Sequence, residues 1–313
     1  MTHDRPLLGI SLMLGFCIIA PLGDAIAKIL GQSVPLGHLL FVRFAVQTAL
    51  LIPIVWITGR HWRMSFNLLR LAFYRTGLHI VGIGAMFTAL RYLPLADAVA
   101  IAFVMPFFML ILGKYVLHED VGARRLIACS VGFIGTLLVI QPSFATVGWP
   151  ALLPLVVAVV FSLFMLLTRK IAKDTDPIAL QAVSGAMATV LILPILLLVP
   201  LATQTDLVPA LPDVQTQILL LVIGSLGTLA HLLMTWSLRY APSATLAPMQ
   251  YLEIPFATLM GWAVFGDLPN GLASLGISIT LGAGLYIVFR ERSMSRAGAP
   301  VQPPQAQDMH AAE

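Results

Sequence analysis

Three polar side chains, Gln250, Tyr251 and Glu253, interrupt residues 239–267, which are otherwise almost entirely apolar. A charged side chain at the centre of a membrane-spanning helix costs about 2.5–3.5 kcal/mol on insertion scales, so Glu253 needs a compensating role. A carboxylate there can bind a proton or a cation, and the neighbouring amide and phenol can hydrogen-bond a solute. The alternative is a structural hydrogen bond from Glu253 to a neighbouring helix. The sequence therefore makes these three residues candidates for a coupling or substrate site.

Two further charges, Asp24 and Arg43, fall at similar depths in consecutive apolar stretches. An ion pair across the turn between them would form an outer gate or bind a zwitterionic substrate. Alternatively, Asp24 pairs with Lys28, four residues on in the favourable acid-first order. Arg43 would then be free for Glu253 or for a substrate carboxylate.

The remaining candidates are His79 and Trp236, which lie in apolar stretches close to other polar groups. A buried histidine is more often a hydrogen-bonded packing residue than part of a proton relay, and the same holds for His231. Metal sites need ligands clustered at characteristic spacings, which these histidines lack. We therefore expect no metal and no cofactor.

The composition is typical of an integral membrane protein. Of 313 residues, 59% are hydrophobic and 10% are charged, and the mean hydropathy is +0.94, whereas soluble domains carry about 25% charged residues. The net charge of +4 is not gathered into a basic face, so we expect no nucleic-acid partner. Cys17 and Cys129 lie in apolar runs, which argues against a disulfide framework.

A helix needs about 20 mainly apolar residues to cross a bilayer. This criterion predicts an all-α integral membrane protein with ten transmembrane helices, at approximately 7–30, 36–58, 71–90, 94–113, 124–141, 149–168, 177–199, 216–238, 243–265 and 271–289.

The basic residues orient these predicted spans. With the N-terminus in the cytoplasm, most of the 18 Lys and Arg side chains fall on the cytoplasmic side. Only Lys28 and Arg91 fall outside, and Arg43 lies within a span. Cytoplasmic loops are enriched in Lys and Arg, so this bias predicts an even number of spans with both termini inside. We expect a multi-pass protein of the inner (plasma) membrane.

Residues 239–267 also repeat an earlier stretch, residues 91–119. Both begin Arg-Tyr-x-Pro-x-Ala, contain a later Pro-Phe and close on an acid. Such self-similarity indicates two structural repeats, and five spans per repeat would insert the second upside down relative to the first. We predict repeats at 1–143 and 144–290, followed by a disordered cytoplasmic tail at 291–313 that is rich in Pro, Gln and Ala.

These motifs resemble the EamA-type drug/metabolite transporter superfamily. The resemblance covers residues 7–290 and rests on the two Arg-Tyr-x-Pro-x-Ala openings, the Pro-Phe pairs (Pro106-Phe107 and Pro255-Phe256) and the closing acids (Glu119 and Asp267). It implies a ten-helix inner-membrane carrier of small metabolites, often an exporter, with amino acids and their derivatives among its substrates.

The sequence thus predicts a secondary transporter, and no enzyme, that works by alternating access around a midplane cavity. No G-x-x-x-x-G-K-[ST] loop is present to bind ATP, so coupling to protons or exchange would drive it. Its partners would be a small-molecule substrate, the lipid bilayer and protons, and it would act as a monomer or homodimer. An intramembrane lipid-modifying enzyme and a passive pore are the alternatives, although neither H-E-x-x-H nor G-x-S-x-G occurs.

Overall fold

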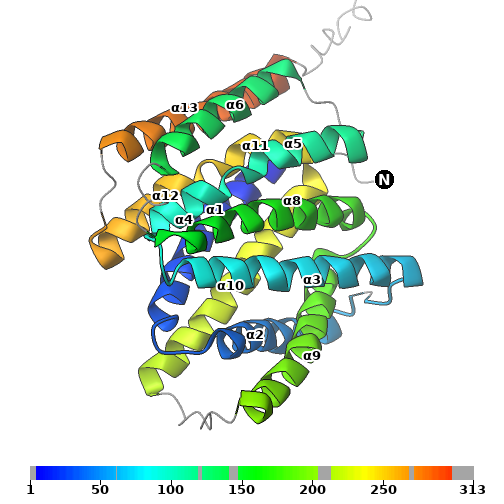
Figure 1. Ribbon diagram of the computed structural model, residues 1–313. Coiled ribbons are helices and arrows are strands. Elements are labelled where there is room, and N and C mark those ends of the chain that lie inside the picture. Colours follow the sequence, from blue (N-terminus) through cyan, green and yellow to red (C-terminus); the bar gives the residue numbers. More distant parts are fainter. Residues whose placement is uncertain are drawn as a thin grey trace, which may run out of the picture.

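The computed structural model describes residues 5–60, 62–118, 122–140, 147–203, 213–267 and 271–297, and the regular structure in these ranges is entirely helical (Figure 1). The elements of the first half are α1 (Pro6–Leu30), α2 (Leu36–Ile57), α3 (Phe66–Ala89), α4 (Leu95–Ala102), α5 (Met105–Val116) and α6 (Ala123–Ile140). Those of the second half are η1 (Trp149–Leu152), α8 (Leu153–Ala172), α9 (Pro177–Thr203), α10 (Val214–Tyr240), α11 (Ser243–Gln250), α12 (Glu253–Met260), η2 (Gly261–Phe265) and α13 (Gly271–Ala297).

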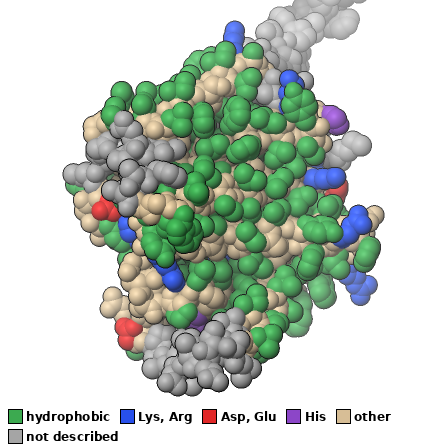
Figure 2. Space-filling model, viewed as in Figure 1, with side chains coloured by type: hydrophobic (Ala, Val, Ile, Leu, Met, Phe, Trp, Pro, Cys, Tyr) green, Lys and Arg blue, Asp and Glu red, His purple; other side chains and the backbone are tan. Residues whose placement is uncertain are grey.

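Six of the described stretches are long and apolar enough to cross a membrane, and shorter apolar helices accompany them. The six are Pro6–Leu30, Leu36–Ile57, Leu95–Val116, Trp149–Ala172, Pro177–Leu198 and Val214–Tyr240. In Figure 2, hydrophobic side chains cover much of the middle of the visible face. Most of the visible Lys and Arg side chains lie toward its right edge. A surface of this kind matches the apolar interior of a bilayer bounded by polar layers.

Two predicted spans, 94–113 and 243–265, are interrupted rather than continuous. Helix α4 ends at Ala102 and α5 begins at Met105, and α11 ends at Gln250 before α12 begins at Glu253. A proline follows each break, Pro106 in one case and Pro255 in the other. Because proline has no N–H and its ring clashes with the carbonyl four residues earlier, it disfavours a continuous helix at these points.

The most extensive helix contacts join the first half of the chain to the second (Figure 1). Helix α1 packs against α10, α2 against α9, α3 against α8, and α6 against α13. The interrupted helices also meet, α4 against α12 and α5 against α11. The first helix of each half therefore packs on the third helix of the other half.

Small residues allow the closest of these approaches. A Cβ added at Gly135 of α6 would lie 2.5 Å from Thr280 Oγ1 and 2.7 Å from the Gly276 carbonyl oxygen, both on α13. Close backbone contact through small residues is a common way for helices to associate in membranes, where burial from water contributes little. Gly135 thus fixes the separation of α6 and α13.

The C-terminal boundary differs from the prediction. Helix α13 continues to Ala297, so residues 291–297, predicted to begin a disordered tail, are helical. Residues 298–313 lie outside the described part of the chain.

Candidate functional site

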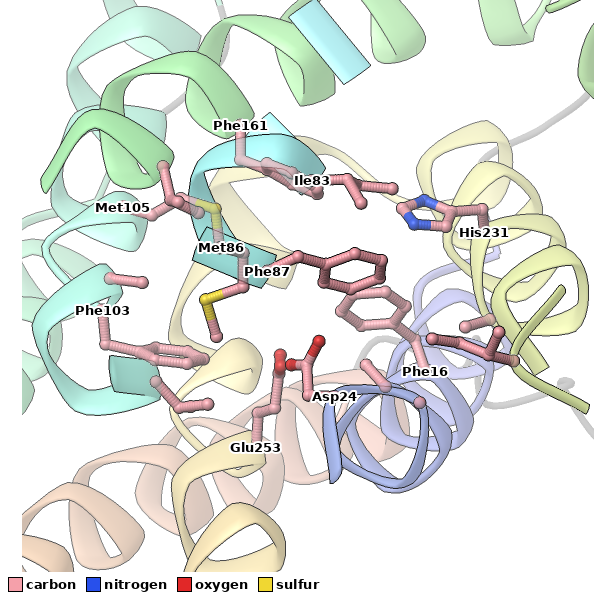
Figure 3. A pocket seen from close by; sticks show the side chains of 17 residues that line it. Phe16, Asp24, Ile83, Met86, Phe87, Phe103, Met105, Phe161, His231 and Glu253 are labelled. Atoms are coloured by element: carbon pink, nitrogen blue, oxygen red, sulfur yellow. The ribbon is translucent and has the colours of Figure 1, made fainter. Parts of the chain in front are cut away.

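A cavity of about 100 Å³ lies among α1, α3, α4, α5, α8, α10 and α12 (Figure 3). Its wall is mainly apolar, and its larger side chains are Phe16, Met86, Phe87, Phe103, Met105 and Phe161. Asp24, His231 and Glu253 are the titratable groups on this wall. Ligand sites commonly combine an apolar wall with a few polar groups, which makes this cavity the candidate site.

Glu253 and Asp24 reach the cavity from different halves of the chain. Glu253 is the first residue of α12, placed there by the break before Pro255, and is 8% exposed. Asp24 is half-buried on α1. Figure 3 shows the two carboxyl groups projecting toward one another into the cavity. Two negative charges at close range in a medium of low polarity repel each other strongly, so this site is built to hold a proton or a cation.

Neither carboxylate has a protein hydrogen-bond partner among the residues that the structure describes, and neither forms an ion pair there. Both predicted pairings of Asp24 were therefore wrong. Lys28 instead pairs with Asp267 at 3.3 Å and lies 4.6 Å from the centre of the Phe265 ring. In the sequence, Asp267 had been noted only as the closing acid of the second repeat motif.

Arg43 is also in a different environment from the one predicted. It is 2% exposed, its Nη1 donates to Gln47 Oε1 at 3.4 Å, and its guanidinium lies 4.8 Å from the centre of the Phe44 ring. Gln47 in turn bonds Gln181, which bonds the His231 carbonyl. Arg43 is thus part of a polar network that joins α2, α9 and α10, and it does not line the cavity.

Gln250 and Tyr251 lie beside Glu253 in sequence but are not on the cavity wall. Gln250 is fully buried and its Nε2 donates to the sulfur atoms of Met109 and Met165, each at 3.3 Å. The Tyr251 hydroxyl donates to the Cys129 carbonyl oxygen at 3.0 Å. Both side chains therefore fasten the break between α11 and α12 to the surrounding helices.

The Tyr251→Phe variant tests this structural assignment. We expect a loss of about 0.5–1.5 kcal/mol in the free energy of unfolding, the usual net value of one hydrogen bond, with solute transport retained. Thermal denaturation and uptake by reconstituted protein measure the two effects. Loss of transport at unchanged stability would instead give the phenol a direct part in the site.

His79 and His231 form a pair that the sequence did not indicate. Their Nε2 atoms lie 3.1 Å apart, and His79 is fully buried whereas His231 reaches the cavity wall. In such a contact the N–H of one ring donates a hydrogen bond to the bare nitrogen of the other, so two neutral rings would hold opposite tautomers. His79 also stacks on Phe164 with a ring-centre distance of 4.6 Å.

Arg75 is fully buried, although the predicted topology placed it among the cytoplasmic charges. Its Nε donates to Thr168 Oγ1 at 2.7 Å and its Nη1 to Ser184 Oγ at 2.9 Å. The guanidinium lies 4.4 Å from the centre of the Phe164 ring. Arg75 lies inside the predicted span 71–90, whereas Arg63 and Arg70 precede it, so this position in the sequence already separated it from the loop charges.

Trp236 is also away from the cavity. It packs against a cluster of buried residues from α2, α9 and α10 that includes Leu51, Ile178 and Leu232. Of the seven candidates from sequence, Glu253 and Asp24 therefore line the cavity, and His79 reaches it through His231. The other four, Gln250, Tyr251, Arg43 and Trp236, surround or support it.

Comparison with known proteins identifies the family. A profile of the EamA-like transporter family matches residues 7–141 and again residues 148–290, which together make up most of the chain. The chain belongs to the EamA-like transporter family. This EamA-like protein is therefore a multi-pass membrane transporter rather than an enzyme, with the lipid bilayer and a small-molecule substrate as its partners.

Relatives of this EamA-like protein differ in the solutes for which they are named. A riboflavin transporter of Rhizobium johnstonii is 30% identical over 227 residues, covering 72% of each chain. An S-adenosylmethionine uptake transporter of Rickettsia felis is 25% identical over 298 residues, covering 93% of this chain and 96% of the relative. A solved crystal structure shares the fold, with a TM-score of 0.69 and 17% identity over 92% of this chain and 98% of the other.

Proposed function

We propose that this protein is a secondary transporter that moves a small organic solute by alternating access around the cavity between Asp24 and Glu253. The observation that carries the proposal is that two carboxylates from different halves of the chain face one mainly apolar cavity. A cavity of about 100 Å³ is smaller than the roughly 300–1,000 Å³ of sites that enclose drug-sized ligands. The cavity must therefore enlarge to bind such a solute, as a carrier that changes conformation would do.

The proposed architecture is ten transmembrane helices in two inverted repeats, residues 1–143 and 144–290. Two observations support it. The family profile matches the chain twice, once in each proposed repeat. The helix pairing is also reciprocal, because α1 packs on α10 as α8 packs on α3, which a two-fold axis between the halves would produce. Inverted repeats provide two conformations of similar energy, each open to one side of the membrane.

We place both termini in the cytoplasm of a cell whose plasma membrane the protein spans. Single cysteines test this orientation, because the native Cys17 and Cys129 are buried and should react little. Gln32→Cys, in the exposed turn after α1, should be labelled by an impermeant maleimide in intact cells. Arg63→Cys, in the exposed segment between α2 and α3, should be labelled only after the cells are opened. If only Arg63→Cys is labelled in intact cells, the orientation is the opposite of the one proposed, with both termini outside.

The relatives support uptake as the direction of transport, because one group of them is named for S-adenosylmethionine uptake. The expected export of amino acids finds no such support. S-adenosylmethionine is itself an amino-acid derivative, so the wider class of amino-acid-related solutes stays within the proposal. Protons or exchange against a second solute would supply the driving force, and the protein would act as a monomer or homodimer.

Solute counterflow in proteoliposomes tests the proposal. Vesicles preloaded with unlabelled S-adenosylmethionine or riboflavin should transiently accumulate the corresponding labelled tracer, and the initial rate should saturate with tracer concentration. A carrier gives both effects because one site is exposed to each side in turn. Flux that rises linearly with concentration and shows no counterflow would identify a passive pore and overturn the proposal.

A further inference from the structure

Both formally charged side chains on the cavity wall are acidic. Asp24 and Glu253 line it, and within the described residues no Lys or Arg side chain does so. A cavity that presents two carboxylates and no cationic side chain attracts positive charge. It also resists anions, since an anion brought against two carboxylates adds repulsion to the loss of its hydration.

The buried guanidiniums near the cavity are held by other groups. Arg43 is bonded to Gln47 and lies over Phe44, and Arg75 is bonded to Thr168 and Ser184. They lie on α2 and α3, with the His79–His231 pair close to them and only His231 reaching the cavity. Neither guanidinium forms a contact ion pair with a carboxylate of the cavity wall, although Arg43 lies near enough to Asp24 for the two charges to attract each other.

The apolar part of the wall also suits a cation. Phe16, Phe87, Phe103 and Phe161 line the cavity, and an aromatic face attracts a cation within about 6 Å of its centre. The same chain makes this contact elsewhere, with Lys28 at 4.6 Å from Phe265 and Arg75 at 4.4 Å from Phe164. Such rings also bind the apolar body of a solute, so the wall can accommodate both parts of an organic cation.

We infer that the solute carried in this cavity is an organic cation with an apolar or aromatic body, whose charge lies between Asp24 and Glu253. This inference rests on the proposed transport function and gives its substrate class. The relatives do not decide the charge, because S-adenosylmethionine carries a sulfonium cation whereas riboflavin is neutral. With a neutral solute, protons would have to neutralise the two carboxylates in place of the solute's own charge.

Equilibrium binding of tritiated phenyltrimethylammonium to the purified full-length protein in lipid nanodiscs tests the inference. We expect saturable binding that unlabelled phenyltrimethylammonium displaces. Benzenesulfonate, an anion of similar size, and tert-butylbenzene, the neutral isostere, should not displace it at the same concentration. Glu253→Gln and Asp24→Asn should each weaken binding by about 30-fold or more, as expected for removing one partner of a buried charge contact.

The matched control is Asp213→Asn, the same chemical change at an exposed position before α10 and away from the cavity. It should leave the affinity unchanged. The inference is overturned if no saturable binding occurs, if either competitor displaces the cation equally well, or if both cavity variants bind as the wild type does.

A counterflow assay on the same preparation separates this inference from the transport proposal. If riboflavin shows counterflow but the cation does not bind, the transport proposal stands and the inference of a cationic substrate is overturned. The opposite result is saturable cation binding that Glu253→Gln abolishes, with no counterflow of S-adenosylmethionine, riboflavin or phenyltrimethylammonium. It would support the cation-binding site and overturn the proposal that the protein is a carrier.

Discussion

Replacing Glu253 by glutamine is expected to lower the initial rate of solute uptake at least about tenfold, because intramembrane carboxylates mark substrate and proton pathways. The substitution keeps the shape of the side chain and removes its charge. Uptake of labelled S-adenosylmethionine, riboflavin and phenyltrimethylammonium into proteoliposomes, with and without a pH gradient, measures the effect. The folded state should survive, because removing an unpaired buried charge does not expose a new uncompensated one.

The control for this experiment is Asp213→Asn, which should transport at the wild-type rate. Asp24→Asn should follow Glu253→Gln in direction, since both carboxylates face the same cavity. Unchanged uptake and unchanged dependence on the pH gradient in Glu253→Gln would remove this residue from the mechanism and leave it a structural role only.

Replacing Gly135 by alanine is expected to lower the stability of the folded protein by about 1–3 kcal/mol, the usual cost of overpacking a tight contact. The added Cβ would lie 2.7 Å from the Gly276 carbonyl oxygen, a backbone atom that moves only if α6 and α13 separate. The apparent melting temperature of the purified protein and the fraction that elutes as a single species both measure this loss.

A matched substitution separates packing from helix propensity. A Cβ at Gly77 of α3 would meet nothing within 4 Å, so Gly77→Ala should leave stability unchanged or raise it by about 0.4–1 kcal/mol. Equal effects of the two substitutions would mean that the α6–α13 contact does not depend on the missing side chain at Gly135.

The helices themselves could be predicted because hydropathy and length largely determine where a chain forms apolar helices. The charges inside apolar stretches likewise pointed to Asp24 and Glu253 without any structural information. Both signals are local in the chain. A charged residue in an apolar run is unusual whatever it contacts, so its presence marks a candidate, although Arg43, chosen by the same signal, does not line the cavity.

The orientation of the residues beside Glu253 could not be predicted in the same way. In a continuous helix, residues three apart share one face, so Gln250 and Glu253 would point the same way. The break between α11 and α12 separates them, and Gln250 turns to Met109 and Met165 while Glu253 turns to the cavity. Pro255 was visible in the sequence, but its effect on direction depends on the helices packed around it.

Long-range pairings were also beyond local reasoning. His79 and His231 are 152 positions apart, and Lys28 and Asp267 are 239 apart. Both pairs join the first half of the chain to the second, and only the packing of α3 and α1 against the second half brings them together. Arg75 shows the same limit, because its partners Thr168 and Ser184 lie on α8 and α9.

Exposure of the cavity to each side of the membrane in turn is the central claim, and accessibility of Ala20→Cys measures it most directly. Ala20 lines the cavity on α1, and the two native cysteines are buried. A membrane-impermeant thiosulfonate is added to sealed right-side-out vesicles and, separately, to inside-out vesicles. We predict that position 20 is modified from both faces and that phenyltrimethylammonium slows both reactions. Modification from one face only, even after prolonged exposure, would contradict alternating access around this cavity.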